Sequence, residues 1–171
     1  AHRFQLVALL AFFLISFNIN AQDFDSQDFE GANCTSIMVG KDASTDGSVM
    51  TSHTCDSWYR TWARWEKAQE HDKDATQKIY RGSMGTRNPY DSKGLELAGE
   101  IPQAEYTYAY LNTAYPCLNE KQLAIGETTF SGPDTLVNPE GMFMIEELER
   151  IVLQRCDNAR DAIRLIDELT K

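Results

Sequence analysis

The chain has 171 residues, with 16 lysines and arginines against 26 aspartates and glutamates, which gives a formal net charge of −10 at pH 7. A chain of this length fits about one domain. The acidic excess argues against a phosphate-backbone partner and a polybasic membrane contact, so we expect no nucleic-acid partner and no stable membrane association of the mature chain.

Residues 1–21 have the pattern of a secretory signal peptide. A weakly basic start at His2 and Arg3 precedes an apolar run over 6–17, and Ala21 offers a small residue for cleavage. The run is shorter than the roughly 20 apolar residues that a membrane-spanning helix needs. We therefore expect export to a periplasmic or extracellular location, with an uncleaved membrane anchor as the alternative.

Residues 22–33 are polar and acidic, without a helical or strand period. Such a segment is exposed and accessible to cleavage, which is typical of a propeptide or of a plain N-terminal tail. If it is removed, Cys34 becomes the first residue of the mature chain. Its α-amine, with a reference pKa of about 7.7–8.0, then lies beside its own thiol and can activate it. The sequence therefore predicts that Cys34 is an N-terminal nucleophile that cleaves amide bonds.

The chain contains four cysteines, Cys34, Cys55, Cys117 and Cys156. In an exported protein the default state of cysteines is disulfide-bonded. A non-catalytic domain stapled by disulfides is therefore a competing hypothesis, and the pairing remains open. His53 lies near Cys55, but no spacing typical of a zinc site occurs, so we expect neither a metal nor a cofactor.

Two strands are predicted over 35–40 and 48–53, joined by a turn that contains Asp46-Gly47. They would form an antiparallel hairpin with Cys34 at its open end, and the second strand would return His53 and Asp56 toward that end.

Further strands are predicted over 106–110, where tyrosines alternate with small residues, and over 123–128, with a turn at 116–121 between them. Helical spacing would place three tryptophans in a core stripe, although a loop that lines the substrate is the alternative; these are Trp58, Trp62 and Trp65.

The last part of the chain, 139–171, has apolar residues at steps of three and four, which predicts two amphipathic helices separated near 156–158. Asp157 is the predicted cap of the second helix. Strands first and helices last indicate an α+β fold, with the helices packed on one face of a sheet.

Three runs together resemble a known family: CTSIMVGKDASTDGSVMTSHTCDS at 34–57, YRTW at 59–62 and LNEKQLAIGETTFSG at 118–132. They resemble the secreted cysteine dipeptidases related to secernin, which belong to the N-terminal nucleophile hydrolases together with bile-salt hydrolase and penicillin V acylase. The resemblance implies a four-layer αββα sandwich. Because such proteins are longer than this chain, it also implies that 34–171 is the N-terminal portion of the domain.

The resemblance also implies site residues. Autocatalytic scission is expected between Asn33 and Cys34, after which Asp56 would hold the α-amine and Asn119 would donate to the oxyanion. Turn or capping roles are the alternatives for both. Relatives carry an arginine where this chain has His53, so the role of that residue stays open. The candidate substrate-binding residues are His53, Arg60 and Glu127.

The activity implied by the resemblance is hydrolysis of dipeptides through an acyl-enzyme, in which the α-amine takes the thiol proton and later passes it to the leaving amine. A neighbouring hypothesis keeps the nucleophile and changes the substrate to an acyl amide, such as a conjugated bile salt or a penicillin. The sequence does not predict an oligomeric state.

Overall fold

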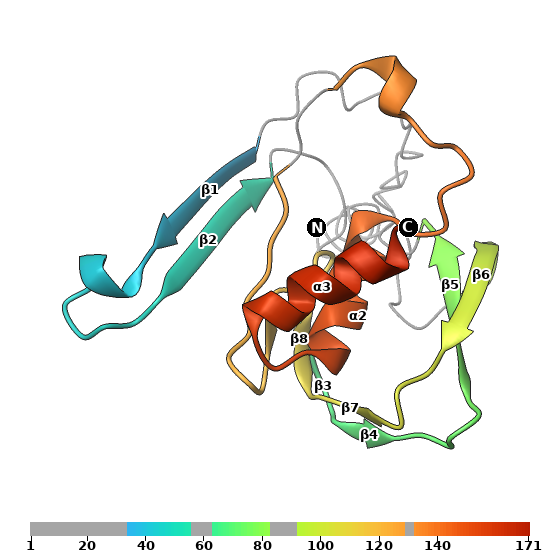
Figure 1. Ribbon diagram of the computed structural model, residues 1–171, viewed down its shortest axis with the longest axis horizontal. Helices are drawn as coiled ribbons and strands as arrows, with labels where there is room; N and C mark the ends of the chain where they lie inside the picture. The colour runs from blue at the N-terminus through green and yellow to red at the C-terminus, as the bar shows by residue number, and fades with distance from the viewer. Residues whose placement is uncertain (1–33, 56–62, 83–91, 129–131) are drawn as a thin grey trace, which may run out of the picture.

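The computed structural model describes residues 34–55, 63–82, 92–128 and 132–171 (Figure 1). Within these residues the strands come first and the two helices last, and all strand pairs are antiparallel. The predicted α+β class is therefore confirmed. The predicted signal peptide at 1–21 and propeptide at 22–33 lie outside the described residues.

The first element is a hairpin that extends away from the helices (Figure 1). In it, β1 (Cys34–Val39) pairs with β2 (Met50–Cys55), and a short 3₁₀ turn, η2 (Lys41–Ala43), begins the connection. Gly47 has φ +76°, a conformation that glycine adopts without strain, and Asp46 accepts a backbone hydrogen bond from the residue two positions on. The predicted hairpin is confirmed, with its second strand two residues later than expected.

A second, longer ribbon supports the rest of the fold. Its three strand pairs are β3 (Arg64–Glu66) with β8 (Tyr110–Asn112), β4 (Gln69–Glu70) with β7 (Tyr106–Thr107), and β5 (Thr76–Arg81) with β6 (Glu96–Pro102). Arg64 opposite Asn112 and Gln69 opposite Thr107 keep one register, so the two pairs belong to one interrupted ladder. A last short strand, β9 (Leu118–Asn119), pairs with β8.

In this region one prediction is wrong and another is confirmed only in part. Trp65 lies on β3 rather than on a helix, and half of its surface is exposed, so it is not part of a helical core stripe. Trp58 and Trp62 lie outside the described residues. The strand expected over 106–110 is divided between β7 and β8, because the N–H of Tyr108 is donated to the carbonyl of Gln154 on the first helix instead of to a ladder.

The strand predicted over 123–128 does not form. Only Ala124 makes an isolated bridge, to Leu118, and Ile125 donates its N–H to the carbonyl of Cys117. Gln122, with φ +64°, turns the chain just before this segment. Beyond Ile125 the segment leaves this short pairing and reaches the hairpin through side-chain contacts, which a periodic pattern cannot foresee.

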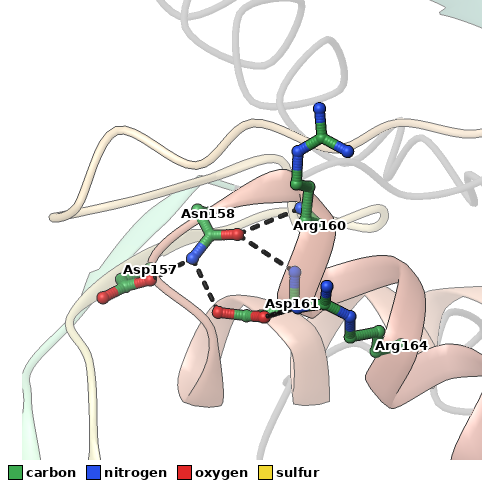
Figure 2. Close-up of polar contacts among 5 residues, drawn as sticks. All are labelled: Asp157, Asn158, Arg160, Asp161 and Arg164. Carbon is green, nitrogen blue, oxygen red and sulfur yellow. Dashed lines mark hydrogen bonds and ion pairs between the residues drawn. The ribbon is translucent and has the colours of Figure 1, made fainter.

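The two predicted helices are confirmed as α2 (Ile145–Arg155) and α3 (Ala159–Leu169). The predicted cap is wrong, since Asn158 caps α3 and Asp157 does not (Figure 2). The side-chain oxygen of Asn158 accepts hydrogen bonds from the backbone N–H groups of Arg160 and Asp161, at 3.1 and 3.0 Å. A cap must immediately precede the first helical residue to reach these groups, and Asp157 is one position too early.

The core lies around α2, which packs against α3, β7, β8 and β9. Ile151 belongs to one buried cluster, with Ile79 and Ile101 of the ribbon, while Val152 and Leu153 belong to a second. Residues adjacent on one helix thus join the two parts of the core. Neither of the two described helices is long and apolar enough to cross a membrane.

Candidate active site

Cys34 is the first residue of β1, and its thiol is half-buried and free of a disulfide. Successive side chains of a strand point to opposite faces, so Cys34 and Ser36 share one face of the hairpin. Ser36 is paired directly opposite His53 on β2, and paired residues also share a face. We call the face that carries Cys34, Ser36 and His53 the cysteine face.

Segment 126–128 lies against the cysteine face. The hydroxyl of Ser36 is hydrogen-bonded to that of Thr128. The imidazole of His53 lies so close to Gly126 that a Cβ atom there would be 1.6 Å from the ring Cε1 and 2.1 Å from Nε2. Only a glycine fits this position with the ring in place. Two separate contacts therefore bring this segment to the strands that carry the cysteine.

Glu127, between these two contact residues, is half-buried and lies in the electrostatic field of two glutamates on α2. Glu146 and Glu149 are 3 % and 1 % exposed, and within the described part of the chain their carboxylate oxygens have no hydrogen-bond partner. Burial raises the pKa of Glu146 to about 7, although an interaction with its own backbone N–H lowers it in part. Burial, and after it the charges of Glu127 and Glu146, raises the pKa of Glu149 to about 8. We call Glu127, Glu146 and Glu149 the acidic cluster.

Asn119 is embedded in the fold, with 2 % of its surface exposed. Its Oδ1 accepts from the N–H groups of Lys121 and Leu123, each at 3.0 Å, and its Nδ2 donates to the carbonyls of Leu153 and Cys156, each at 2.8 Å. The side chain thus closes the turn after β9 and ties it to the end of α2. Since both amide hydrogens are in use, the oxyanion role stays a prediction.

The structure places the other predicted site residues unevenly. His53 lies on the cysteine face and Glu127 beside it, whereas Asn33, Asp56 and Arg60 lie outside the described residues. Sequence reasoning missed the contact residues of the cysteine face and the buried glutamates, which are Ser36, Gly126, Thr128, Glu146 and Glu149. The sequence offered one signal for these contacts, Gly126, because a glycine inside a strand-like run often marks a close approach of another group. Among the described residues, no group of three or more histidine, cysteine or acidic side chains is arranged to hold a metal ion.

An α+β domain with a free, half-buried cysteine thiol at the start of a strand fits the class of thiol-dependent enzymes. Residues 33–171 match peptidase family C69, and the chain belongs to this family. The resemblance to the secernin-related dipeptidases is thereby confirmed, and family membership identifies a cysteine-type dipeptidase, a hydrolase that acts on peptides. No curated protein and no solved structure matches the chain.

Proposed function

We propose that the protein hydrolyses dipeptides with Cys34 as an N-terminal nucleophile, which scission after Asn33 exposes. One observation carries this proposal: the family match begins at residue 33, and the first strand of the described residues begins at Cys34. The matched region thus starts one residue before this cysteine, at the proposed scission point. Segment 126–128 contacts Ser36 and His53 on the same face of the hairpin, which supports its proposed role as a second wall of the site.

In the proposed reaction the α-amine of Cys34 accepts the thiol proton, and the thiolate attacks the carbonyl carbon of the peptide bond. The carbon–nitrogen bond breaks, the proton goes to the leaving amine, and a thioester remains on Cys34. Water then hydrolyses the thioester and restores the thiol. Asp56 would support the transient ammonium. For Asn119 to stabilise the oxyanion, at least one of its amide hydrogens must leave its present acceptor.

The proposal extends to processing, location and fold. Residues 1–21 would direct export to the periplasm or the outside of the cell, and 22–33 would be the propeptide. We propose an αββα sandwich because the hairpin exposes apolar side chains on the face opposite the cysteine. There, Ile37 is 60 % and Met50 is 51 % exposed, and a further layer would bury both.

Replacement of the nucleophile tests the proposal. In Cys34→Ala we expect the residues before position 34 to remain attached and kcat/KM for dipeptides to fall by about 10⁴-fold or more, as for the loss of other catalytic nucleophiles. Mass spectrometry of the N-terminus and a dipeptide assay measure the two effects. Cys156→Ala, which removes a buried thiol of the core, is the matched control and should keep both processing and activity.

The proposal is wrong if the product keeps residues 22–33 and still hydrolyses peptides at the full rate. Assays of conjugated bile salts and penicillin V beside dipeptides separate the acyl-amide hypothesis, which predicts that the amides are the better substrates. Alkylation of the native protein addresses the disulfide-stapled hypothesis, because a labelled Cys34 excludes a bridge at that residue.

A further inference from the structure

The acidic cluster is electrostatically incomplete. Buried carboxylates are normally paired with a cation or neutralised by a proton, because removal of an ionised group from water is costly. Glu146 and Glu149, one helical turn apart on α2, are almost fully buried and have no hydrogen-bond partner within the described residues. Their unmet oxygens point to a missing positively charged group that donates hydrogen bonds.

The arginines of α2 do not fill this role. Arg150 pairs with Glu147 on the same helix. Arg155 donates to the side chain of Gln77 at 2.7 Å and to the carbonyl of Pro102 at 2.9 Å, both on the ribbon. Both arginines of α2 thus interact with other groups. The missing positive charge has to come from a ligand or from another part of the protein.

The position of Glu127 favours a ligand of the active site. Its two sequence neighbours contact the cysteine face, Gly126 through His53 and Thr128 through Ser36. The negative charge of Glu127 also acts on both glutamates of α2 and contributes to raising their pKa values. The segment therefore has the cysteine face at its flanking residues and the acidic cluster at its centre.

We propose that the acidic cluster binds the α-ammonium group of the peptide substrate, with half-buried Glu127 at the entrance and Glu146 and Glu149 beneath it. This inference rests on the proposed function, since a dipeptide carries its ammonium nitrogen only two bonds from the carbonyl carbon that the thiolate attacks. An ammonium offers three donors to carboxylate acceptors. A site that requires this group restricts cleavage to the first peptide bond of an unblocked chain.

Among the described residues, two further groups interact with the cluster, and neither carries a positive charge. The nearby carboxylate of Glu147 is held by Arg150, and the thiol of Cys117, whose pKa burial and the charge of Glu149 raise, stays neutral. Without ligand, the high pKa values of Glu146 and Glu149 keep much of the pair protonated near pH 7. An incoming ammonium allows both to ionise, so binding should release protons to the solvent.

The first test compares alanylalanine with propionylalanine, which has the same scissile bond and no ammonium, on the full chain. We expect Glu149→Gln and Glu146→Gln to lower kcat/KM for alanylalanine by about 10- to 100-fold, mainly through KM, as for loss of one charged hydrogen-bond partner. Hydrolysis of propionylalanine should change by less than about twofold. Glu140→Gln, on an exposed residue outside the cluster, is the matched control. Equal losses on both substrates, or none, overturn the inference.

The second test does not depend on hydrolysis. 2-Aminopropan-1-ol carries the ammonium, and propane-1,2-diol has a hydroxyl in its place. NMR titration should show tighter binding of the amine to the wild type, and Glu149→Gln should abolish this preference. That result supports the site even if the chain cleaves no dipeptide. If dipeptides are cleaved through Cys34 but the amine and the diol bind alike, the proposed function stands and the ammonium site is wrong.

Discussion

At the scale of single residues, the contact between His53 and Gly126 decides how the hairpin meets the rest of the protein. The imidazole occupies the space in which any other residue at 126 would place its Cβ atom. Glycine here therefore serves close approach, since its φ lies outside the left-handed region. The second contact, between Ser36 and Thr128, holds the segment to the other strand of the hairpin, at the residue paired with His53.

We expect Gly126→Ala to displace the His53 ring and to destabilise the protein by about 1–3 kcal/mol, the usual cost of overpacking. Dipeptidase activity should fall with it, because the segment packed on the cysteine face moves. Thermal unfolding and a dipeptide assay measure both effects. The double variant His53→Ala/Gly126→Ala should recover stability, and Gly40→Ala, where a Cβ meets nothing within 4 Å, should change little. An unchanged Gly126→Ala variant would contradict this packing.

Residue roles were predictable only in part. The family resemblance named Cys34, His53 and Glu127 as site residues, and the structure brings the segment that contains Glu127 against the face that carries Cys34 and His53. The glutamates of α2 gave no such signal. Glutamate on an amphipathic helix normally faces water, whereas Glu146, Glu147 and Glu149 are all buried and Ile145 is 43 % exposed. What covers a helix face depends on distant segments, which its own sequence does not encode.

At the scale of elements, α3 depends on its first turn. Asn158 accepts two backbone N–H groups, and its Nδ2 also donates to the carboxylate of Asp161 at 2.7 Å, which Arg164 holds from the next turn (Figure 2). These contacts, first the hydrogen bond from Asn158, lower the pKa of Asp161. All of these hydrogen bonds from and to Asn158 depend on its side chain, so a single substitution removes them.

We expect Asn158→Ala to destabilise the protein by about 1 kcal/mol, since alanine leaves the first N–H groups of α3 without an acceptor. The melting temperature should fall by about 2–4 °C for a chain of this size. Asp157→Ala, which removes the cap predicted from the sequence, is the control and should cost less than half as much. A larger loss in the control would restore Asp157 as the cap.

Elements with local causes were predicted well. The hairpin follows from a turn at Asp46-Gly47, and both helices follow from apolar spacing. The segment over 123–128 was read wrongly as a strand because its composition is strand-like. Its backbone instead leaves the ladder after Ile125 to meet the hairpin. Contacts far apart in the sequence override local preference in such cases.

At the scale of the whole molecule, the burial of α2 in the core competes with the ionisation of its glutamates. The helix supplies the residues that join both core clusters, yet its first turns hold carboxylates that burial keeps from ionising freely. The fold class could be predicted from the order of strands and helices, but this conflict could not, because it exists only once α2 is enclosed.

The conflict predicts how stability depends on pH. In the unfolded chain a glutamate titrates near pH 4.5, whereas in the native state Glu149 titrates at about pH 8 and Glu146 at about pH 7. Between these values the native state binds more protons than the unfolded state, so the free energy of unfolding should decrease as pH rises from about 4.5 to 8. The two glutamates contribute their full stabilisation to the native state below about pH 4.5 and lose it as pH rises through their native pKa values.

Glu149→Gln should flatten this decrease and raise the melting temperature above that of the wild type near pH 8. Urea unfolding at a series of pH values measures the slope. Glu140→Gln, on an exposed side chain, should keep the slope of the wild type. A wild-type slope of opposite sign across the window would show that these carboxylates ionise in the native protein.

The long ribbon also has a consequence for the way the chain reaches its native state. Its partners are nearest in sequence at Arg81 and Glu96 and farthest apart at Arg64 and Asn112, with no change of order between. The entropic cost of closing a loop rises with the length of chain enclosed. Pairing of β5 with β6 therefore costs least, and strand pairing can proceed from there toward β3 and β8. Each strand pair that forms shortens the loop that the next pair must close. The strands β7 and β8, against which α2 packs, therefore pair last.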